Sequence, residues 1–370
     1  MKKFLQYLCV LMAAAGVFMA AKYLDGGSMI KAPAAQAPAV QMEAQQTEAP
    51  MPVETEAPAT VETEVETEPA EDHRFILSFV GDCTLGCRDA HSYIDYGFTK
   101  VMGDDYGYPF RNVVSYFDND DYTVINLEGA LCDEGHPVNN THTFRGPTSY
   151  IEILTQNSVE FASLANNHTM DYSQKGYDST IATLEAGGVS YVERDKSAIV
   201  TTENGLTIGF YGSVYYLMEK DVITAAIQEL RPQVDLLIFA PHWGVEGSYL
   251  PNEEQTTLAH AAIDAGADIV YGSHPHVLQP IEEYNGGIIY YSLGNFSFGG
   301  NIYPNDYDSA LIQQEVLLSS NGELTIGETV KVPVCISSSE WRNDYQPVPY
   351  EEGTEAYDRV LAKLDGTWKK

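Results

Sequence analysis

The stretch Phe75-Ile-Leu-Ser-Phe-Val-Gly-Asp82 decides the fold of this 370-residue chain. Its first six residues carry no charge and are apolar apart from one serine, which is typical of a strand buried on both faces. Glycine and a carboxylate follow at once. The stretch therefore predicts a buried strand that presents a polar group at its carboxyl end, where open α/β sheets bind ligands.

Apolar runs of this kind recur along the chain to about Asn295 and alternate with helical patterns. Further strands are predicted at 122–126, 160–165, 206–211, 235–240, 268–272 and 287–293, with helices at 173–186 and 253–265 among them. Such alternation predicts an α/β fold. Beyond residue 300, two β-like runs at 310–318 and 323–333 predict a hairpin closing the sheet, and a terminal helix is expected after Tyr350.

Polar clusters follow five of the predicted strands. They are Gly81-Asp82, Asn126-Leu-Glu128-Gly, Asn166-Asn167-His168, Pro241-His242-Trp-Gly and Gly272-Ser-His274-Pro-His276. Taken singly, Asp82 is typical of a helix N-cap and His242 of a hydrogen-bonded core histidine. Five such clusters in order instead indicate a metal site, and their mixed oxygen and nitrogen donors suit Mn, Fe or Zn. The His-x-His pair is expected on one side of an extended segment.

These motifs, with Tyr291-Ser-Leu-Gly-Asn295-Phe, resemble the CapA family of poly-γ-glutamate capsule synthesis proteins from about residue 74 to 298. That family is similar to the calcineurin-like metallophosphoesterases, which implies a β-sandwich flanked by helices. The resemblance implies two metal ions that activate water and polarise a phosphoryl oxygen. By position, the implied ligands are Asp82, Glu128, Asn167, His242, His274 and His276.

The same resemblance implies roles for residues around the ligands. His168 would be the catalytic histidine that protonates the leaving oxygen. Arg145 would hold an anionic group of the substrate, with a surface salt bridge as the alternative. Residues expected to orient the ligands are Asn166, Asp171, Glu282 and Asn295.

One position departs from the phosphoesterase pattern. Thr84 stands where Asp-x-His is usual, so the first metal loses an imidazole and weaker or exchangeable binding is expected there. Thr84 itself, a water or His91 could fill the gap. Cys83 and Cys87 flank this motif, and without a second cysteine pair they indicate buried free thiols more than a zinc site.

The first 72 residues read as two segments outside the folded domain. Residues 1–25 combine Met1-Lys2-Lys3 with 18 uncharged residues, which predicts a signal peptide or a membrane anchor. Phe18 is too bulky for the −3 position of a cleavage site, which favours an anchor. Residues 26–72 lack aromatic residues and repeat Val-Glu-Thr-Glu, which predicts a disordered acidic stalk. We therefore expect a CapA-like domain at 73–345 and a helical tail at 346–370, on the extracytoplasmic face of the membrane or secreted if cleaved.

The charge of the chain limits its partners. The formal net charge is −33, and 42 acidic against 16 basic residues remain after residue 72. Nucleic acid is excluded as an expected partner, whereas cations are attracted.

Three functions follow from the sequence. The first is a metal-dependent hydrolase acting on a phosphoester-type group of a cell-surface polymer or its precursor. The second is a non-catalytic component of a membrane-bound polymer synthesis and export complex. The third is a degenerate metal-binding fold that recognises a ligand without turnover, for which Thr84 is the argument. The sequence has no Gly-rich phosphate loop followed by Lys and Ser or Thr, so polymerisation is assigned to other proteins.

Overall fold

A computed structural model describes residues 72–138 and 141–369. The predicted anchor and almost all of the predicted stalk lie outside these ranges. Within them, each helix is too short or too polar to cross a membrane.

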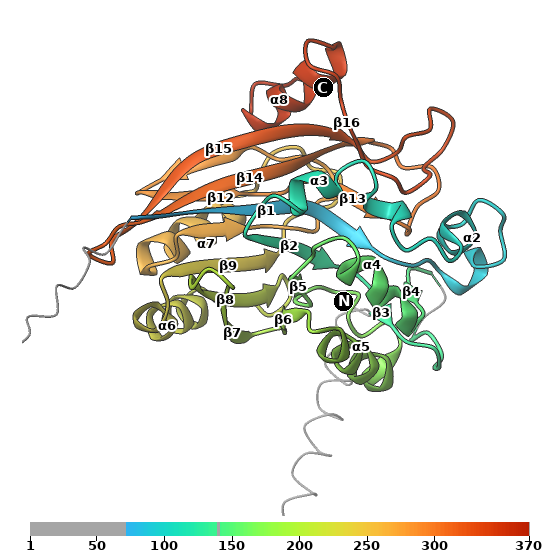
Figure 1. Cartoon of the computed structure of the whole chain (residues 1–370), viewed down its shortest axis with the longest axis horizontal. Helices are drawn as coiled ribbons and strands as arrows, with labels where there is room; N and C mark the ends of the chain where they lie inside the picture. The colour runs from blue at the N-terminus through green and yellow to red at the C-terminus, as the bar shows by residue number, and fades with distance from the viewer. Residues whose placement is uncertain (1–71, 139–140, 370) are drawn as a thin grey trace, which may run out of the picture. The chain divides into compact units, whose positions relative to one another are not determined.

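Two sheets form the centre of the fold (Figure 1). In spatial order, the strands of the first sheet are β16 (Val348–Pro349), β15 (Leu324–Cys335), β14 (Asp308–Leu318), β1 (His73–Thr84), β2 (Tyr122–Leu127), β5 (Phe161–Ser163) and β6 (Ser190–Val192), and β13 (Asn295–Phe298) also pairs with β1. Those of the second are β11 (Ile281–Tyr284), β12 (Gly287–Tyr290), β10 (Ile269–Tyr271), β9 (Leu236–His242), β8 (Thr207–Val214) and β7 (Lys196–Thr201). A third, two-stranded sheet joins β3 (Ala130–Leu131) to β4 (Arg145–Gly146).

The predicted strands are confirmed in both sheets. Each sheet contains a run of four parallel strands: β1, β2, β5 and β6 in the first sheet, and β8, β9, β10 and β12 in the second. The predicted hairpin is β14 paired antiparallel with β15. Because parallel strands point the same way, their carboxyl ends gather at one edge of each sheet.

The two sheets pack face to face through an apolar core. Alternate residues of β1, Phe75, Leu77 and Phe79, point into this core, as the two-residue period of a strand requires. Between the sheets, Phe161 of β5 stacks on Phe210 of β8 with ring centroids 3.7 Å apart. This packing gives the expected β-sandwich.

Helices cover the outer faces of the sandwich. Those over the first sheet are α2 (Phe98–Met102), α3 (Val114–Phe117), α4 (Ile151–Thr155) and α5 (Ser173–Gly187), and those over the second are α6 (Lys220–Leu230) and α7 (Glu253–Ala265). Short 3-10 helices occur at Asp89–His91, Tyr108–Phe110, Thr148–Tyr150 and Arg231–Gln233. The α/β sandwich flanked by helices is thus confirmed.

Local sequence explains where α7 begins and ends. The Asn252 side chain accepts from the backbone N–H of Gln255, whose own side chain accepts from the N–H of Asn252. Gly266 ends the helix in the left-handed conformation, with φ 117°.

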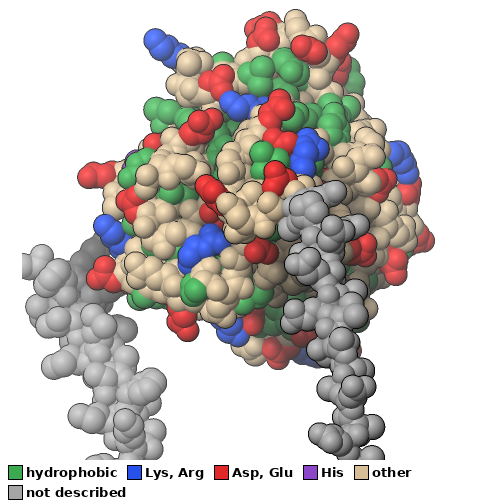
Figure 2. Space-filling view, turned by 60° about the vertical axis from the view of Figure 1, so that its left-hand side comes forward, with side chains coloured by type: hydrophobic (Ala, Val, Ile, Leu, Met, Phe, Trp, Pro, Cys, Tyr) green, Lys and Arg blue, Asp and Glu red, His purple; other side chains and the backbone are tan. Residues whose placement is uncertain are grey.

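The expected terminal helix is α8 (Glu355–Leu364), begun by a hydrogen bond from the Tyr357 N–H to the Thr354 hydroxyl. Its Lys363 contacts the carboxylates of Asp306 and Asp308 at 2.6 and 2.8 Å. Figure 2 shows Asp and Glu side chains scattered over one face of the molecule.

Candidate metal centre

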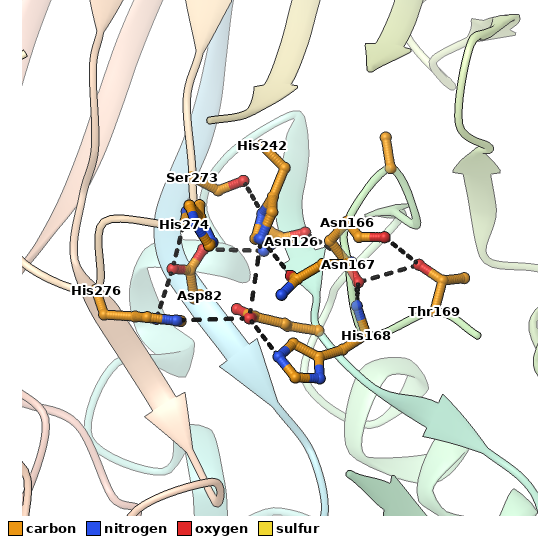
Figure 3. A network of polar contacts seen from close by, with 12 residues as sticks. Asp82, Asn126, Asn166, Asn167, His168, Thr169, His242, Ser273, His274 and His276 are labelled. Atoms are coloured by element: carbon orange, nitrogen blue, oxygen red, sulfur yellow. Dashed lines mark hydrogen bonds and ion pairs between the residues drawn. The ribbon is translucent and has the colours of Figure 1, made fainter. Parts of the chain in front are cut away.

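The five polar clusters of the sequence meet at the carboxyl ends of the parallel strands. Asp82 lies on β1 beside Asn126 of β2 and Asn295 of β13, in register with both. His242, the last residue of β9, forms a bridge with Ser273, which follows β10. Two separate sheets therefore contribute to one site, in which His168, His242 and His276 converge (Figure 3).

Close backbone approach at Gly81 makes this meeting possible. The backbone N–H of Asp82 donates to the carbonyl of Gly294 at 2.8 Å. A Cβ on residue 81 would lie 2.3 Å from the carbonyl oxygen of Gly294, so a larger residue would separate β1 from this loop.

Glu128 is the centre of the site. Its carboxylate is fully buried, and neither oxygen has a hydrogen-bond partner. Nε2 of His276, His168 and His242 lie 3.6, 3.7 and 3.9 Å from its Oε1, too far for hydrogen bonds. A buried carboxylate without partners is costly, and a cation among these groups would offset that cost.

Two groups of side chains could each hold a metal ion. The ligand atoms of Asp82, Glu128 and His276 lie within 4.8 Å of one another, as do those of Glu246, His274 and His276. Nδ1 of His274 is buried and has no hydrogen-bond partner, so it is free to bind a cation. These donors fit the divalent transition metals expected from the sequence.

His242 is oriented as a ligand by its neighbours. Its Nδ1 lies 2.8 Å from the hydroxyl of Ser273, and its Nε2 lies 2.8 Å from Oδ1 of Asn167. The Ser273 hydroxyl also lies 3.4 Å from the carbonyl of Pro241, to which it can donate while accepting from His242. Without a cation, Nε2 donates to the Asn167 oxygen; with the proton on Nδ1, donated to Ser273, Nε2 and the Asn167 oxygen would become a pair of metal donors.

A chain of amides links the strand ends that hold the acidic ligands. The side-chain amide of Asn166 donates to Oδ1 of Asn126, and that of Asn126 donates to Oδ1 of Asp82 at 2.9 Å. Oδ1 of Asn295 lies 2.9 Å from Nδ1 of His276. Asn166 and Asn295 thus lie where the sequence placed them, beside the predicted ligands.

His168 is held by Asp171, whose Oδ2 lies 2.8 Å from Nδ1 of the imidazole. The same carboxylate oxygen accepts from the backbone N–H of Phe144, whose ring contacts His168. Asp171 therefore fixes the ring and directs Nε2 toward Glu128.

Burial and charge separate the pKa values of the histidines. Burial lowers the pKa of His242 well below its usual value and, together with His276, that of His274 to about 4. Both rings are thus neutral, the form that binds metals. Burial opposes the charged form of His276, but Glu128 and Asp82 outweigh it and raise its pKa to about 10. Burial raises the pKa of Glu128 to about 7.

Backbone geometry at the His-x-His motif differs from the expectation. The segment is not extended: His274 and His276 have φ of 97° and 56°, and the residues form a bend after β10. This expectation was wrong because the chain turns at the strand end, and the turn directs both rings toward the site, with centroids 5.9 Å apart. Positive φ at two non-glycine residues is costly and typical of functional sites.

A cavity of about 850 Å³ opens over the site. Asn167, His168 and His276 line it, whereas Asp82, Glu128 and His242 are fully buried beneath. Residues to which the sequence assigned no role also line it, among them Arg88, Tyr215 and Glu246. For Glu246 a signal existed, since it follows His242 by four residues in the loop at the same strand end.

Two sequence expectations are placed elsewhere. Glu282 accepts hydrogen bonds from His260 of α7 and from Tyr291, which follows β12, at 3.0 and 2.7 Å. Neither partner is a predicted metal ligand, so Glu282 does not orient one. This corrects the expectation, and the reason is that residue 282 lies on β11, at the edge of the second sheet. Arg145 pairs with Asp89 at 2.9 Å and lines a separate depression with Cys87 and Cys132, the arrangement that the salt-bridge alternative predicts.

The structure also shows the surroundings of Thr84, which stands where the phosphoesterase pattern has a histidine. Thr84 is buried and its hydroxyl has no hydrogen-bond partner. His91 lies 3.2 Å from a guanidinium nitrogen of Arg88 and belongs to neither candidate metal group of the described residues. Cys83 and Cys87 are buried and free, as predicted.

The sequence of the chain is similar to those of known capsule synthesis proteins. The family model described as Bacterial capsule synthesis protein PGA_cap matches residues 76–300. The PGA biosynthesis protein CapA of Bacillus subtilis (strain 168) is 30% identical over 273 residues, covering 67% of this chain and 70% of the relative. The capsule biosynthesis protein CapA of Bacillus anthracis is 31% identical over 284 residues, covering 68% and 66%. The chain thus spans about two thirds of the length of these relatives.

Two solved structures are more distant. The NAD nucleotidase NadN of Haemophilus influenzae has a TM-score of 0.42 at 12% identity, covering 80% of this chain and 56% of that one. The purple acid phosphatase PPD1 of yellow lupin has a TM-score of 0.34 at 11% identity, covering 71% and 54%.

Proposed function

The chain belongs to the bacterial capsule synthesis protein PGA_cap family, and on that premise we propose that it is a metal-dependent hydrolase serving capsule or cell-surface polymer synthesis. Its substrate is a phosphoester or similar anionic group of the polymer, such as poly-γ-glutamate, or of a precursor. The names of the two CapA relatives support the biological setting.

The buried carboxylate of Glu128 carries the chemical part of this proposal. It has no hydrogen-bond partner and faces three imidazole nitrogens at 3.6 to 3.9 Å. Such spacing suits cations placed between the groups, since metal ions bind these donors at about 2.0 to 2.2 Å. Asp82 and His276 would hold one ion with Glu128, and Asn167, His242 and His274 would hold the other.

When bound, two divalent ions activate water and polarise a phosphoryl oxygen. His168 acts beside them as the general acid. Asp171 and Glu128 raise the pKa of this imidazole although burial opposes them, which favours the protonated ring near neutral pH. Its Nε2, at the cavity, would then give a proton to the leaving oxygen.

The test is metal content together with hydrolysis of an activated phosphodiester, measured on the full chain and on His168→Ala and His274→Ala. We expect about two Mn, Fe or Zn ions per wild-type chain. His168→Ala should keep the metal and lose turnover, whereas His274→Ala should lose both. Absence of metal from the wild type would overturn the site.

Thr84 supports a second candidate function, a non-catalytic metal-binding component of a membrane-bound polymer synthesis and export complex. The first metal lacks the usual imidazole, and the buried hydroxyl in its place is a weak donor. Metal binding without turnover of any phosphoester by the wild type would favour this assembly role. For both candidate functions, the domain works outside the cytoplasm. It is anchored by residues 1–25, or secreted if this segment is cleaved, and its partners are the polymer synthesis and export proteins.

A further inference from the structure

Glu246 is an exposed acidic residue that neither the sequence motifs nor the proposed ligand set includes. It lies in the loop after β9 and lines the cavity over the site. Its carboxylate belongs to a group with His274 and His276 in which all ligand atoms lie within 4.8 Å of one another.

The loop that carries Glu246 is fixed against the His-x-His turn. The backbone N–H of Trp243 donates to the carbonyl of Ser273 at 3.0 Å, and that of Gly247 donates to the carbonyl of Pro275 at 2.8 Å. Residue 246 lies between these two anchors. Its position beside the histidines is therefore set by backbone hydrogen bonds on both sides and not by its own side chain.

The contacts of the side chain agree with a role toward a ligand. Among the described residues, no Lys or Arg side chain forms an ion pair with Glu246, so its carboxylate is not held away from the histidines. Beside it, Nδ1 of His274 is buried without a partner, in a ring that is 7% exposed. The Glu246 carboxylate thus lies beside an imidazole whose buried Nδ1 has no hydrogen-bond partner, and a cation could bind both groups.

From this geometry we propose that Glu246 is a further metal ligand, which joins His276 on the ion that Asp82 and Glu128 would hold, beside the ion that His274 would hold. The inference rests on the proposed metal site and extends its ligand set. It also offers a reason why Thr84 is tolerated. The Glu246 carboxylate, next to the second sheet, would replace the imidazole that the first metal loses at residue 84 on the first sheet.

A consequence concerns which metal the site prefers. With Glu246, the oxygen donors are Asp82, Glu128, Asn167 and Glu246, against three imidazoles. Carboxylate-rich sites suit Mn²⁺ better than sites built from nitrogen and sulfur donors do. The ligand is thus a divalent cation of this kind, and Mn²⁺ is the practical probe.

The experiment is calorimetric titration of Mn²⁺ into the metal-stripped full chain, for the wild type, Glu246→Gln and Glu352→Gln. Glu352 is a matched control, since it is an exposed glutamate near the start of α8. We expect Glu246→Gln to lose one binding event or to weaken it by about tenfold or more, while Glu352→Gln binds as the wild type does.

The outcomes separate this inference from the proposed function. Two Mn²⁺ ions bound equally well by the wild type and Glu246→Gln would overturn the role of Glu246 and leave the metal site standing. No Mn²⁺ bound by the wild type would overturn both. The melting temperature of each metal-free chain, expected to be unchanged in Glu246→Gln, shows whether an altered titration reflects the ligand and not the fold.

Discussion

Oδ2 of Asp171 lies 2.8 Å from Nδ1 of His168 and also accepts the backbone N–H of Phe144. One carboxylate oxygen thus ties the imidazole of the proposed general acid to the backbone of the neighbouring loop. His168 can neither rotate nor change its protonated nitrogen without breaking this contact, and its Nε2 remains directed at Glu128.

The first prediction tests this contact. Asp171→Asn should lower kcat for an activated phosphodiester by about 10- to 100-fold, because the neutral amide stabilises the protonated ring less and orients it less firmly. Metal content should stay at the wild-type value, since Asp171 is not a ligand. Asp104→Asn, at an exposed residue, serves as the control, and equal kcat in both variants would contradict the positioning role.

The second prediction concerns Glu128, whose burial raises its pKa to about 7. In metal-free protein at pH 8, burying the Glu128 charge costs more than its attraction to His276 returns, so Glu128→Gln should increase the free energy of unfolding by about 1–3 kcal/mol. With Mn²⁺ present the wild type should become the more stable of the two proteins, because only the wild type gains stability from the bound ion. Urea unfolding with and without Mn²⁺ measures the two free energies of unfolding. A Glu128→Gln variant that is less stable than the wild type in both conditions would refute this prediction.

The third prediction is a pH dependence of the metal-free protein. Glu128 and Asp82 raise the pKa of His276 to about 10 against the opposing effect of burial. A raised imidazole pKa stabilises the fold fully below about 6.5, and this stability is lost as the pH rises through about 10. Thermal unfolding of chelator-treated protein should therefore show a melting temperature that falls from pH 6.5 to 10. His276→Gln should flatten that fall, and parallel curves for the two proteins would contradict it.

A fourth prediction tests the packing of the two sheets. Phe210 is fully buried and stacks on Phe161 across the sandwich. Phe210→Ala should cost about 3–5 kcal/mol of unfolding free energy, measured by urea titration, because it removes an aromatic ring from the core between the sheets. Val222→Ala, at a residue 55% exposed on α6, should change it by about 0.5 kcal/mol or less. Similar losses of unfolding free energy in Phe210→Ala and Val222→Ala would contradict the role of this core in joining the sheets.

The strands and the residues at their ends were predictable because two local signals coincide there. An apolar run such as 75–80 indicates a buried strand, and the polar residues that follow must lie at its end, so Asp82 and His242 could be placed from the sequence. The bend at His274 and His276 could not, because positive φ at a non-glycine residue leaves no mark in the residue types. Glu282 was misplaced because a motif match does not say which edge of a sheet a strand occupies.

Loops are where the sequence was least informative. Glu246 reaches the site through backbone hydrogen bonds between two loops that are distant in the chain, and no periodicity reports such contacts. The two arginines near the site are a second example. The sequence resemblance indicated Arg145, yet of the two arginines only Arg88 lines the cavity, where its guanidinium donates to the carbonyl of Thr141 at 2.7 Å.

The last prediction follows from that difference. An anionic substrate entering the cavity would meet the guanidinium of Arg88, whereas Arg145 is held by Asp89 and by the ring of Tyr172 in a separate depression. Arg88→Gln should therefore raise KM for a phosphodiester by about tenfold, the loss of one charge-assisted hydrogen bond, with kcat little changed. Arg145→Gln should alter KM by about twofold or less, because a partly exposed ion pair contributes little beyond its own loop. Steady-state kinetics on both variants at equal metal content decides the matter: a larger rise in KM for Arg145→Gln would return the substrate contact to the residue that the sequence resemblance had indicated.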